Sequence, residues 1–273
     1  MSNTKIEWAN KVWNPVTGCN KVSRGCKNCY AEIMHRRLTK MNPQKYNKPF
    51  LDGAFPHVQS LEIPLHWKKP TKIFVNSMSD LFHPQVPFSF VNDIMSVIEQ
   101  CPQHKFIILT KRPENALRYT QESNYTFEAN NIWLGVSIED QQTADERIPL
   151  LLQIPANIRF ISAEPLIGDI NLEVWIHKCL TNGCGDKIDW VIVGGESGKS
   201  ARPLHPDWVR SIRDNCKALG IKFFFKQWGN NVFVPPGFGE VPCLVPRRIS
   251  KKKAGRLLDG VEHNEFPKGV EHN

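Results

Sequence analysis

Six short apolar segments recur along the chain at nearly even spacing, and this pattern constrains the fold more than any other feature. They begin roughly 25 to 35 residues apart, which is the length of one strand, one helix and two loops in a parallel sheet. The runs are continuously apolar, as is typical of strands buried on both faces. The six segments are residues 72–76, 105–109, 131–136, 157–161, 189–193 and 221–225.

A seventh strand is predicted at residues 11–16, and helical patterns fill several of the intervals. Residues 88–100 place Val91, Ile94 and Ile98 on one helical face, and residues 206–219 form a similar pattern that stops before Gly220, the expected C-cap. Seven parallel units in one chain predict an α/β fold, a complete or partial (β/α) TIM-like barrel. An open doubly wound sheet is the alternative.

We predict one domain, with the barrel in residues 1–228 and an irregular, basic C-terminal extension at 229–273 packed on it. No apolar run approaches the roughly 20 residues that cross a bilayer. The N-terminus also lacks the apolar core of a signal peptide. These observations predict a cytoplasmic protein with no membrane partner.

Polar side chains follow each apolar segment, at the end of a parallel sheet where catalytic groups gather. Carboxylates and lysines at one such end favour a zwitterionic ligand, with its ammonium on a carboxylate and its carboxylate on a lysine. We expect Glu164, Glu196 and Lys226 to be catalytic. The expected ligand-binding residues are Ser79, Asp80, Thr110, Lys111, Ser137 and Glu139.

Three of the eight cysteines lie close together in a loop at residues 19–29. Cys19, Cys26 and Cys29 have the spacing C-x6-C-x2-C, after the first predicted strand and before a helix that begins near Tyr30. Thiolates suit soft metal centres. A [4Fe–4S] cluster with one open iron is the favoured interpretation, and zinc with His35 as fourth ligand is the alternative.

Two other cysteines, Cys179 and Cys184, supply only two of the four ligands that zinc usually needs. A variable surface loop is therefore the favoured interpretation of that segment, with a disulfide or a second metal as alternatives.

An open iron beside carboxylates and lysines matches the chemistry of S-adenosylmethionine (SAM). The methionine amine and carboxylate of SAM would bind the open iron, and one-electron reduction would cleave the sulfonium to a 5′-deoxyadenosyl radical. This interpretation requires an electron donor as a partner.

The chain carries 35 Lys+Arg against 27 Asp+Glu, a net charge of +8, and part of the excess lies at Arg247, Arg248 and residues 251–253. A basic run of this kind is typical of either a solvated tail or a nucleic-acid contact.

Five motifs resemble the phage Gp37/Gp68-like family, which is widespread in phages and bacteria. They are WNPVTGC at 13–19, CYAE at 29–32, FISAEP at 160–165, VGGES at 193–197 and FKQWG at 225–229. The resemblance extends from about residue 6 to residue 267 and implies little about activity.

The strand-end residues more distantly resemble the spore photoproduct lyase branch of the radical SAM superfamily, in which they hold the SAM methionine moiety. The matching positions are Ser79–Asp80, Thr110–Lys111 and Ser137. On this resemblance Asp80 receives the ammonium and Lys111 the carboxylate. The chain departs from that family in three ways. Its cysteine loop has three residues more than C-x3-C-x2-C, and Asn28 stands where an aromatic residue usually precedes the third cysteine. Gly194-Gly195-Glu196 follows the sixth strand instead of the second.

The first hypothesis is therefore a radical SAM enzyme, a lyase, transferase or oxidoreductase acting on a nucleic-acid base or nucleotide. The alternative is a zinc-stabilised nucleic-acid-binding protein without catalysis. A third interpretation, a hydrolase that uses Glu164 and Glu196, leaves the three thiols without a role.

Overall fold

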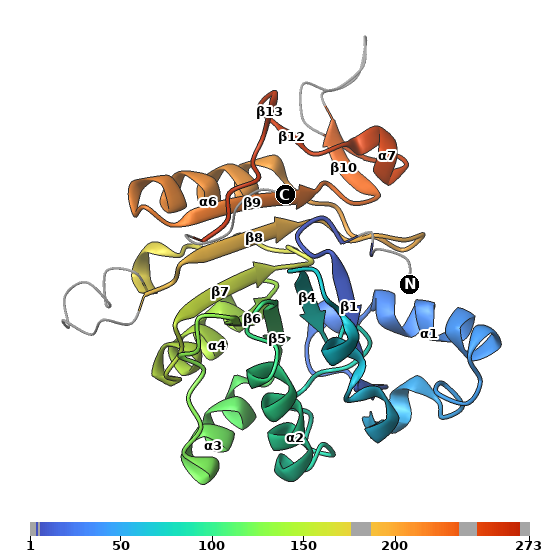
Figure 1. Ribbon diagram of the computed structural model, residues 1–273. Coiled ribbons are helices and arrows are strands. Elements are labelled where there is room, and N and C mark those ends of the chain that lie inside the picture. The colour runs from blue at the N-terminus through green and yellow to red at the C-terminus, as the bar shows by residue number, and fades with distance from the viewer. Residues whose placement is uncertain (1–3, 5, 176–186, 235–244, 268–273) are drawn as a thin grey trace. The chain divides into compact units, whose positions relative to one another are not determined.

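The computed structural model describes residues 4, 6–175, 187–234 and 245–267 (Figure 1). The chain divides into two compact units: the first contains Met1–Val136 and Leu150–Arg159, and the second contains Ser137–Pro149 and Phe160–Asn273. Cys179, Cys184 and the interpretations attached to them lie outside the described residues.

Four parallel strands form the sheet of the first unit, in the order β1 (Lys11–Trp13), β4 (Lys72–Val75), β5 (Lys105–Thr110) and β6 (Ile132–Ile138), whose last two residues belong to the second unit. Ile73 pairs with Phe106, and Phe106 pairs with Ile132. All three side chains are fully buried, as their apolar runs predicted.

The first strand is shorter than predicted, because Asn14 and Pro15 end it at Trp13. Proline has no amide hydrogen to donate to a ladder, which favours the end of a strand at this position. The chain turns there, and β2 (Val16–Thr17) pairs antiparallel with β3 (Phe55–Pro56). This turn leads the chain directly into the cysteine loop.

Three helices belong to the first unit: α1 (Tyr30–Met41), α2 (Phe88–Glu99) and α3 (Pro113–Ser123). The predicted apolar face of α2 is confirmed, since Val91, Ile94 and Ile98 are buried. Short 3-10 turns, which the sequence pattern did not predict, occupy η1 (Arg24–Cys26), η2 (Phe50–Asp52), η3 (Val58–Ser60) and η4 (Ile63–His66).

Three parallel strands form the sheet of the second unit, in the order β7 (Ile158–Ala163), β8 (Trp190–Gly194) and β9 (Lys222–Gln227); the first two residues of β7 belong to the first unit. All five residues of the central strand β8 are buried.

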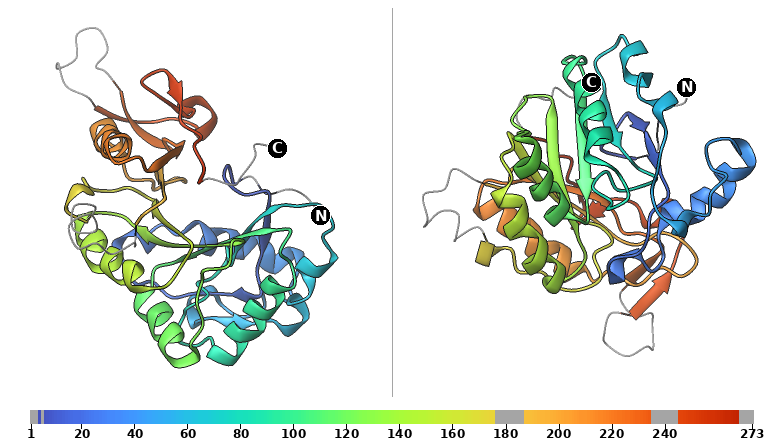
Figure 2. Two further views of the ribbon diagram at one scale, coloured as in Figure 1. Left: turned by 60° about the vertical axis from the view of Figure 1, so that its left-hand side comes forward. Right: turned by 90° about the horizontal axis from the view of Figure 1, so that it is seen from below.

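Two helices accompany this sheet: α4 (Gln141–Gln153), whose last four residues belong to the first unit, and α6 (Pro206–Ala218), which packs along β9 (Figure 2). The helix α6 ends before Gly220, which has a φ of 69°. The predicted glycine stop is confirmed.

Residues on both sides of the predicted boundary at 228–229 lie in the second unit. The C-terminal segment contains two short antiparallel ladders, β10 (Asn231–Val234) with β11 (Val245–Arg248) and β12 (Leu257–Leu258) with β13 (Val261–Glu262), and the helix α7 (Lys251–Ala254) between them. Trp190 of β8 donates to the carbonyl of Glu265 over 2.8 Å and packs against Phe266. The end of the segment therefore packs on β8.

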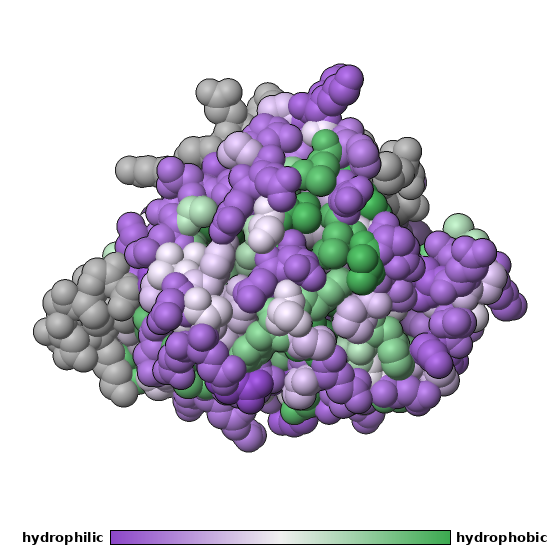
Figure 3. All heavy atoms as spheres, turned by 60° about the horizontal axis from the view of Figure 1, so that its bottom comes forward, coloured by the Kyte–Doolittle hydropathy of each residue, from purple (hydrophilic) through white to green (hydrophobic). Residues whose placement is uncertain are grey.

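The fold is α/β with parallel strands, as predicted. Hydrophilic side chains cover much of the face drawn in Figure 3, with apolar side chains between them. Among the described residues, no helix combines the length and the apolar character needed to span a bilayer.

Candidate functional site

Asp80 lies buried shortly after β4 and accepts four hydrogen bonds. Its Oδ1 accepts from Thr110 Oγ1 over 2.7 Å and from the Phe82 amide over 3.1 Å. Its Oδ2 accepts from the Lys111 amide over 2.9 Å and from Arg112 Nη1 over 3.0 Å. The predicted proximity of Asp80 and Thr110 is therefore confirmed. Because both oxygens already have protein donors, a ligand ammonium would have to replace one of them.

Arg112 connects Asp80 to the cysteine loop. Its Nη1 lies 3.6 Å from Cys19 Sγ, and its Nη2 donates to Asn20 Oδ1 over 2.7 Å and to the Asn20 carbonyl over 3.1 Å. Burial opposes the guanidinium charge, but Asp80 and Cys19 outweigh it, so the pKa of Arg112 is raised. The buried side chain therefore remains a cation.

Sequence reasoning gave Arg112 no role. One sequence feature could have pointed to it: an arginine at the end of a strand, followed directly by Pro113. Pro113 begins α3, and proline is favoured at the first position of a helix. Such a junction fixes the backbone beside the neighbouring strand end, where Asp80 stands.

The three thiols form one electrostatically connected group. Burial, and then the charge of Asp80, raise the pKa of Cys19 to about 11, while Arg112 opposes this shift. Burial also raises the pKa of Cys29. Hydrogen bonds from the backbone amides of Glu32 and Ala31 and the charge of Lys111 oppose this rise. Cys26 lies close enough to the other two thiols to raise the pKa of each of them.

The cysteine loop presents three thiols, the donor type of a soft metal centre. All three are free and half-buried. Cys19 and Cys29 pack against the same apolar cluster, formed by Ala31, Tyr46, Phe50 and Met78. Among the described residues, no group of three or more His, Cys, Asp or Glu side chains is arranged to hold a metal ion. The donor set suits a soft metal, but binding one requires deprotonated thiols and movement of the sulfur atoms toward one another.

His35, the predicted fourth ligand of a zinc site, has other neighbours. Its ring lies on the inner face of α1 with its centroid 5.6 Å from the rings of both Tyr46 and Phe50. Its Nδ1 is 3.4 Å from Thr39 Oγ1, and burial lowers its pKa. The structure therefore places His35 in an aromatic contact and gives no support for a zinc ligand.

The predicted strand-end residues divide between the two units. Ser79, Asp80, Thr110 and Lys111 belong to the first unit with the three cysteines, and Ser79 Oγ donates to the Gly18 carbonyl over 2.6 Å, next to Cys19. The residues of the second unit are Ser137, Glu139, Glu164, Glu196 and Lys226.

Two of the predicted carboxylates in the second unit pair with arginines. Glu139 is fully buried, with its Oε2 3.2 Å from Arg147 Nη1. Glu196 is 5% exposed and accepts from Arg202 at both oxygens, over 2.5 Å at Oε1 and 3.0 Å at Oε2. These pairs stabilise the loops after β6 and β8. Ser137 donates to the Glu164 carbonyl over 3.1 Å.

Glu164 and Lys226 form an ion pair beside Gly194, at the end of β8. Glu164 Oε2 lies 2.7 Å from Lys226 Nζ. A Cβ on Gly194 would lie 2.7 Å from Glu164 Oε1, so glycine is required for this arrangement. Glu164 Oε1 and the Oγ of Ser162, two residues earlier in the chain, are both buried, and neither has a hydrogen-bond partner among the described residues. The pair thus keeps acceptor atoms that a donor group of a ligand would satisfy.

His83 adds a testable pH dependence to the first unit. It is 2% exposed, its Nδ1 accepts from the Gln85 amide over 3.1 Å, and its Nε2 lies 3.0 Å from Asn20 Oδ1. Burial, and then the charge of Arg112, lower its pKa from 6.5 to about 4. Between about pH 6.5 and about pH 4, His83 is therefore neutral in the folded state, whereas the same side chain takes up a proton in the unfolded chain.

The free energy of unfolding is accordingly expected to fall as the pH drops from about 6.5 to about 4, and His83→Gln should reduce this slope. Urea denaturation at a series of pH values measures it. The control His66→Gln changes an exposed side chain and should leave the slope as in the parent. Equal slopes in the parent and in His83→Gln would contradict the prediction.

Comparison with curated proteins and with solved structures returned no match. A family model described as a protein of unknown function, DUF5131, matches residues 3–267. This match includes the cysteine loop, the Asp80–Arg112 pair and the Glu164–Lys226 pair. Since it covers nearly all of the 273 residues, the chain belongs to the DUF5131 family.

Proposed function

We propose that this protein is a radical SAM-type enzyme in which Cys19, Cys26 and Cys29 bind a [4Fe–4S] cluster with one iron open to SAM. When bound, the cluster and SAM would supply one-electron chemistry at the sulfonium. The reaction belongs to the lyase, transferase or oxidoreductase class, and a nucleic-acid base or nucleotide is the substrate class. In this proposal the parallel strands of the two units belong to a partial TIM-like barrel.

The observation that supports the proposal is that two of the three thiols lie near cations. Arg112 Nη1 lies 3.6 Å from Cys19 Sγ, and the charge of Lys111 opposes the rise that burial causes in the pKa of Cys29. Three thiolates in one half-buried loop repel one another, and nearby cations reduce the cost of ionising them. A solvated loop without a metal needs no such arrangement.

The hydrogen bonds of Asp80 change the role that we assign to it. Asp80 accepts from Thr110 and Arg112 and so holds the guanidinium beside Cys19. We assign Asp80 and Arg112 as positioning residues for the thiol loop. Lys111 stays the proposed partner of the SAM carboxylate.

The second unit supplies the residues proposed to contact the substrate. Within the part of the chain that the structure describes, Glu164 Oε1 and Ser162 Oγ are buried acceptors without partners, so they fit an N–H or O–H donor such as the edge of a base. Lys226 holds the other oxygen of Glu164. In this assignment Lys226 fixes the orientation of Glu164.

Anaerobic reconstitution with iron and sulfide tests the proposal. We expect about four irons per chain, a broad absorption shoulder at about 400 nm and SAM cleavage in the presence of a reductant. Cys26→Ala should lose the cleavage activity and the shoulder. Cys101→Ala, which changes a buried cysteine outside the loop, should keep both.

Two results would contradict the proposal. One is SAM cleavage that persists in Cys26→Ala, and the other is a colourless protein that contains zinc after anaerobic purification.

A further inference from the structure

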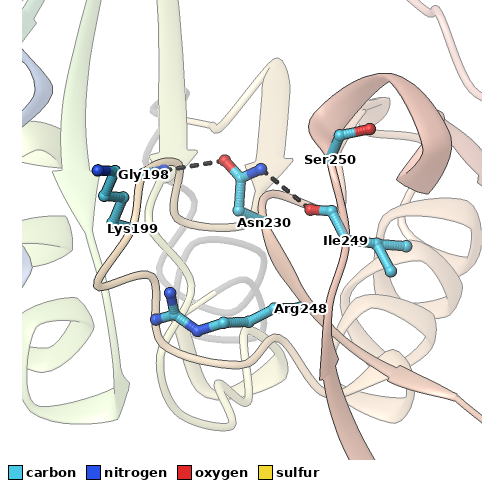
Figure 4. A pocket seen from close by; sticks show the side chains of 6 residues that line it. All are labelled: Gly198, Lys199, Asn230, Arg248, Ile249 and Ser250. Carbon is cyan, nitrogen blue, oxygen red and sulfur yellow. Dashed lines mark hydrogen bonds between the residues drawn. The ribbon is translucent and has the colours of Figure 1, made fainter.

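The second unit has a surface hollow in which all the charged side chains are basic. It measures about 380 Å³ and is lined by Gly198, Lys199, Asn230, Arg248, Ile249 and Ser250. Figure 4 shows the side chains of Lys199 and Arg248 beside Asn230. Lys199 comes from the loop after β8, and Arg248 is the last residue of β11. We call this feature the basic hollow.

Asn230 holds the two sides of the basic hollow together. Its Oδ1 accepts from the Gly198 amide over 2.9 Å, and its Nδ2 donates to the Ile249 carbonyl over 3.0 Å (Figure 4). The Ile249 amide returns a hydrogen bond to the Asn230 carbonyl over 3.2 Å. The spacing between the loop after β8 and the end of β11 is therefore set by the fold before any ligand arrives.

The charges around the basic hollow are strongly one-sided. Residues 246–256 contain six lysines and arginines and no acidic residue. The carboxylate closest in sequence to Lys199 is Glu196, which is neutralised by Arg202. Lys199, Arg248 and the side chains of residues 251–253 are exposed. A ligand in the hollow thus meets a positive potential from the loop after β8 and from the segment that follows β11.

We propose that the basic hollow binds the phosphodiester backbone of a nucleic acid, with Lys199 and Arg248 as the phosphate contacts. Arginine and lysine supply most phosphate contacts in nucleic-acid complexes. Ser250 Oγ accepts from the Lys253 amide, which leaves its hydroxyl hydrogen to donate to a phosphate oxygen. A hollow suits a protruding phosphate better than it suits a flat bilayer surface, and its only aliphatic lining residue, Ile249, is half-buried.

This inference deepens the proposed function, because it names the surface that would hold a nucleic-acid substrate. It rests on that function only for the identity of the reaction. Binding at the basic hollow needs neither a cluster nor SAM, so each proposal can fail while the other holds.

Fluorescence anisotropy with a labelled single-stranded DNA and an RNA of the same sequence, between 50 and 200 mM salt, tests the inference. The double variant Lys199→Ala/Arg248→Ala is expected to bind about tenfold more weakly at the lowest salt. The slope of log K against log salt should decrease by roughly 1.4, which corresponds to two phosphate contacts on a single strand.

The matched control is Lys68→Ala/Lys69→Ala, which removes two exposed lysines of the first unit and lowers the net charge equally, from +8 to +6. It should bind like the parent. Lys199→Arg should also bind like the parent, because it keeps the charge. Cys26→Ala should bind normally even when it has lost SAM cleavage.

Three outcomes would overturn the inference. They are no nucleic-acid binding by the parent at 50 mM salt, equal weakening in the hollow and control variants, and tighter binding to phosphatidylserine vesicles than to nucleic acid with the same dependence on Lys199 and Arg248.

Discussion

Replacing Arg112 by alanine is expected to lower the free energy of unfolding by about 3 to 5 kcal/mol. The substitution leaves the Asp80 carboxylate, which is 6% exposed, without its only counter-charge among the described residues. It also removes both guanidinium hydrogen bonds to Asn20, which hold the start of the cysteine loop. An uncompensated buried charge is among the costliest single changes in a folded protein. Urea denaturation followed by tryptophan fluorescence measures the loss.

Two controls separate this effect from general destabilisation. The double variant Asp80→Asn/Arg112→Met should lose less than Arg112→Ala alone, because it leaves no charge unpaired. Arg118→Ala removes an exposed arginine that pairs with Glu122 on the surface and should cost less than about 1 kcal/mol. If Arg112→Ala costs no more than Arg118→Ala, the Asp80–Arg112 pair does not stabilise the first unit.

Gly195→Ala is expected to destabilise the second unit by about 3 kcal/mol, the upper end of the usual cost of overpacking. A Cβ at this position would lie 2.1 Å from the Trp228 carbonyl oxygen and 2.6 Å from its carbon. Both are backbone atoms directly after β9, so no rotation of a side chain relieves the contact. Thermal and urea denaturation measure the effect.

The neighbouring glycine provides the matched comparison. In Gly194→Ala the new Cβ meets the carboxylate of Glu164, which can rotate away, so the expected loss of stability is only about 1 kcal/mol. That rotation breaks the ion pair with Lys226, so Gly194→Ala should change ligand binding more than stability. Equal stability of Gly195→Ala and the parent would show that the β8 and β9 ends do not approach closely.

The repeat of apolar segments predicted the strands well because each strand is buried on both faces. β8 illustrates this, since its unbroken apolar run corresponds to five buried residues between β7 and β9. The segment from Pro49 to Trp67 was not predicted. It folds mainly as short 3-10 turns, whose hydrogen bonds depend on local backbone geometry and leave no periodic pattern in the sequence.

The sequence predicted which residues follow the strands of the candidate site, but it did not predict most of the contacts between them. Parallel neighbours β4 and β5 bring Asp80 to Thr110, as the strand-end argument expected. The sequence did not show that Asp80 would accept four protein hydrogen bonds. Likewise, Glu139 pairs with Arg147, eight residues later in the chain, and Glu196 pairs with Arg202, six residues later. Only the folded structure shows that these two carboxylates face an arginine instead of a ligand.

The three thiols differ in how firmly the fold holds them. Arg112 holds Cys19, and Cys29 stands at the beginning of α1, whereas Cys26 ends a three-residue turn between them. Bringing the sulfur atoms together therefore amounts to rearranging residues 20–28, with both ends of that segment already in place. The entropy lost on closing a segment of nine residues is small when its ends are fixed. Binding at the thiols should thus slow amide hydrogen exchange chiefly in residues 20–28 and leave exchange in β4 and β5 unchanged.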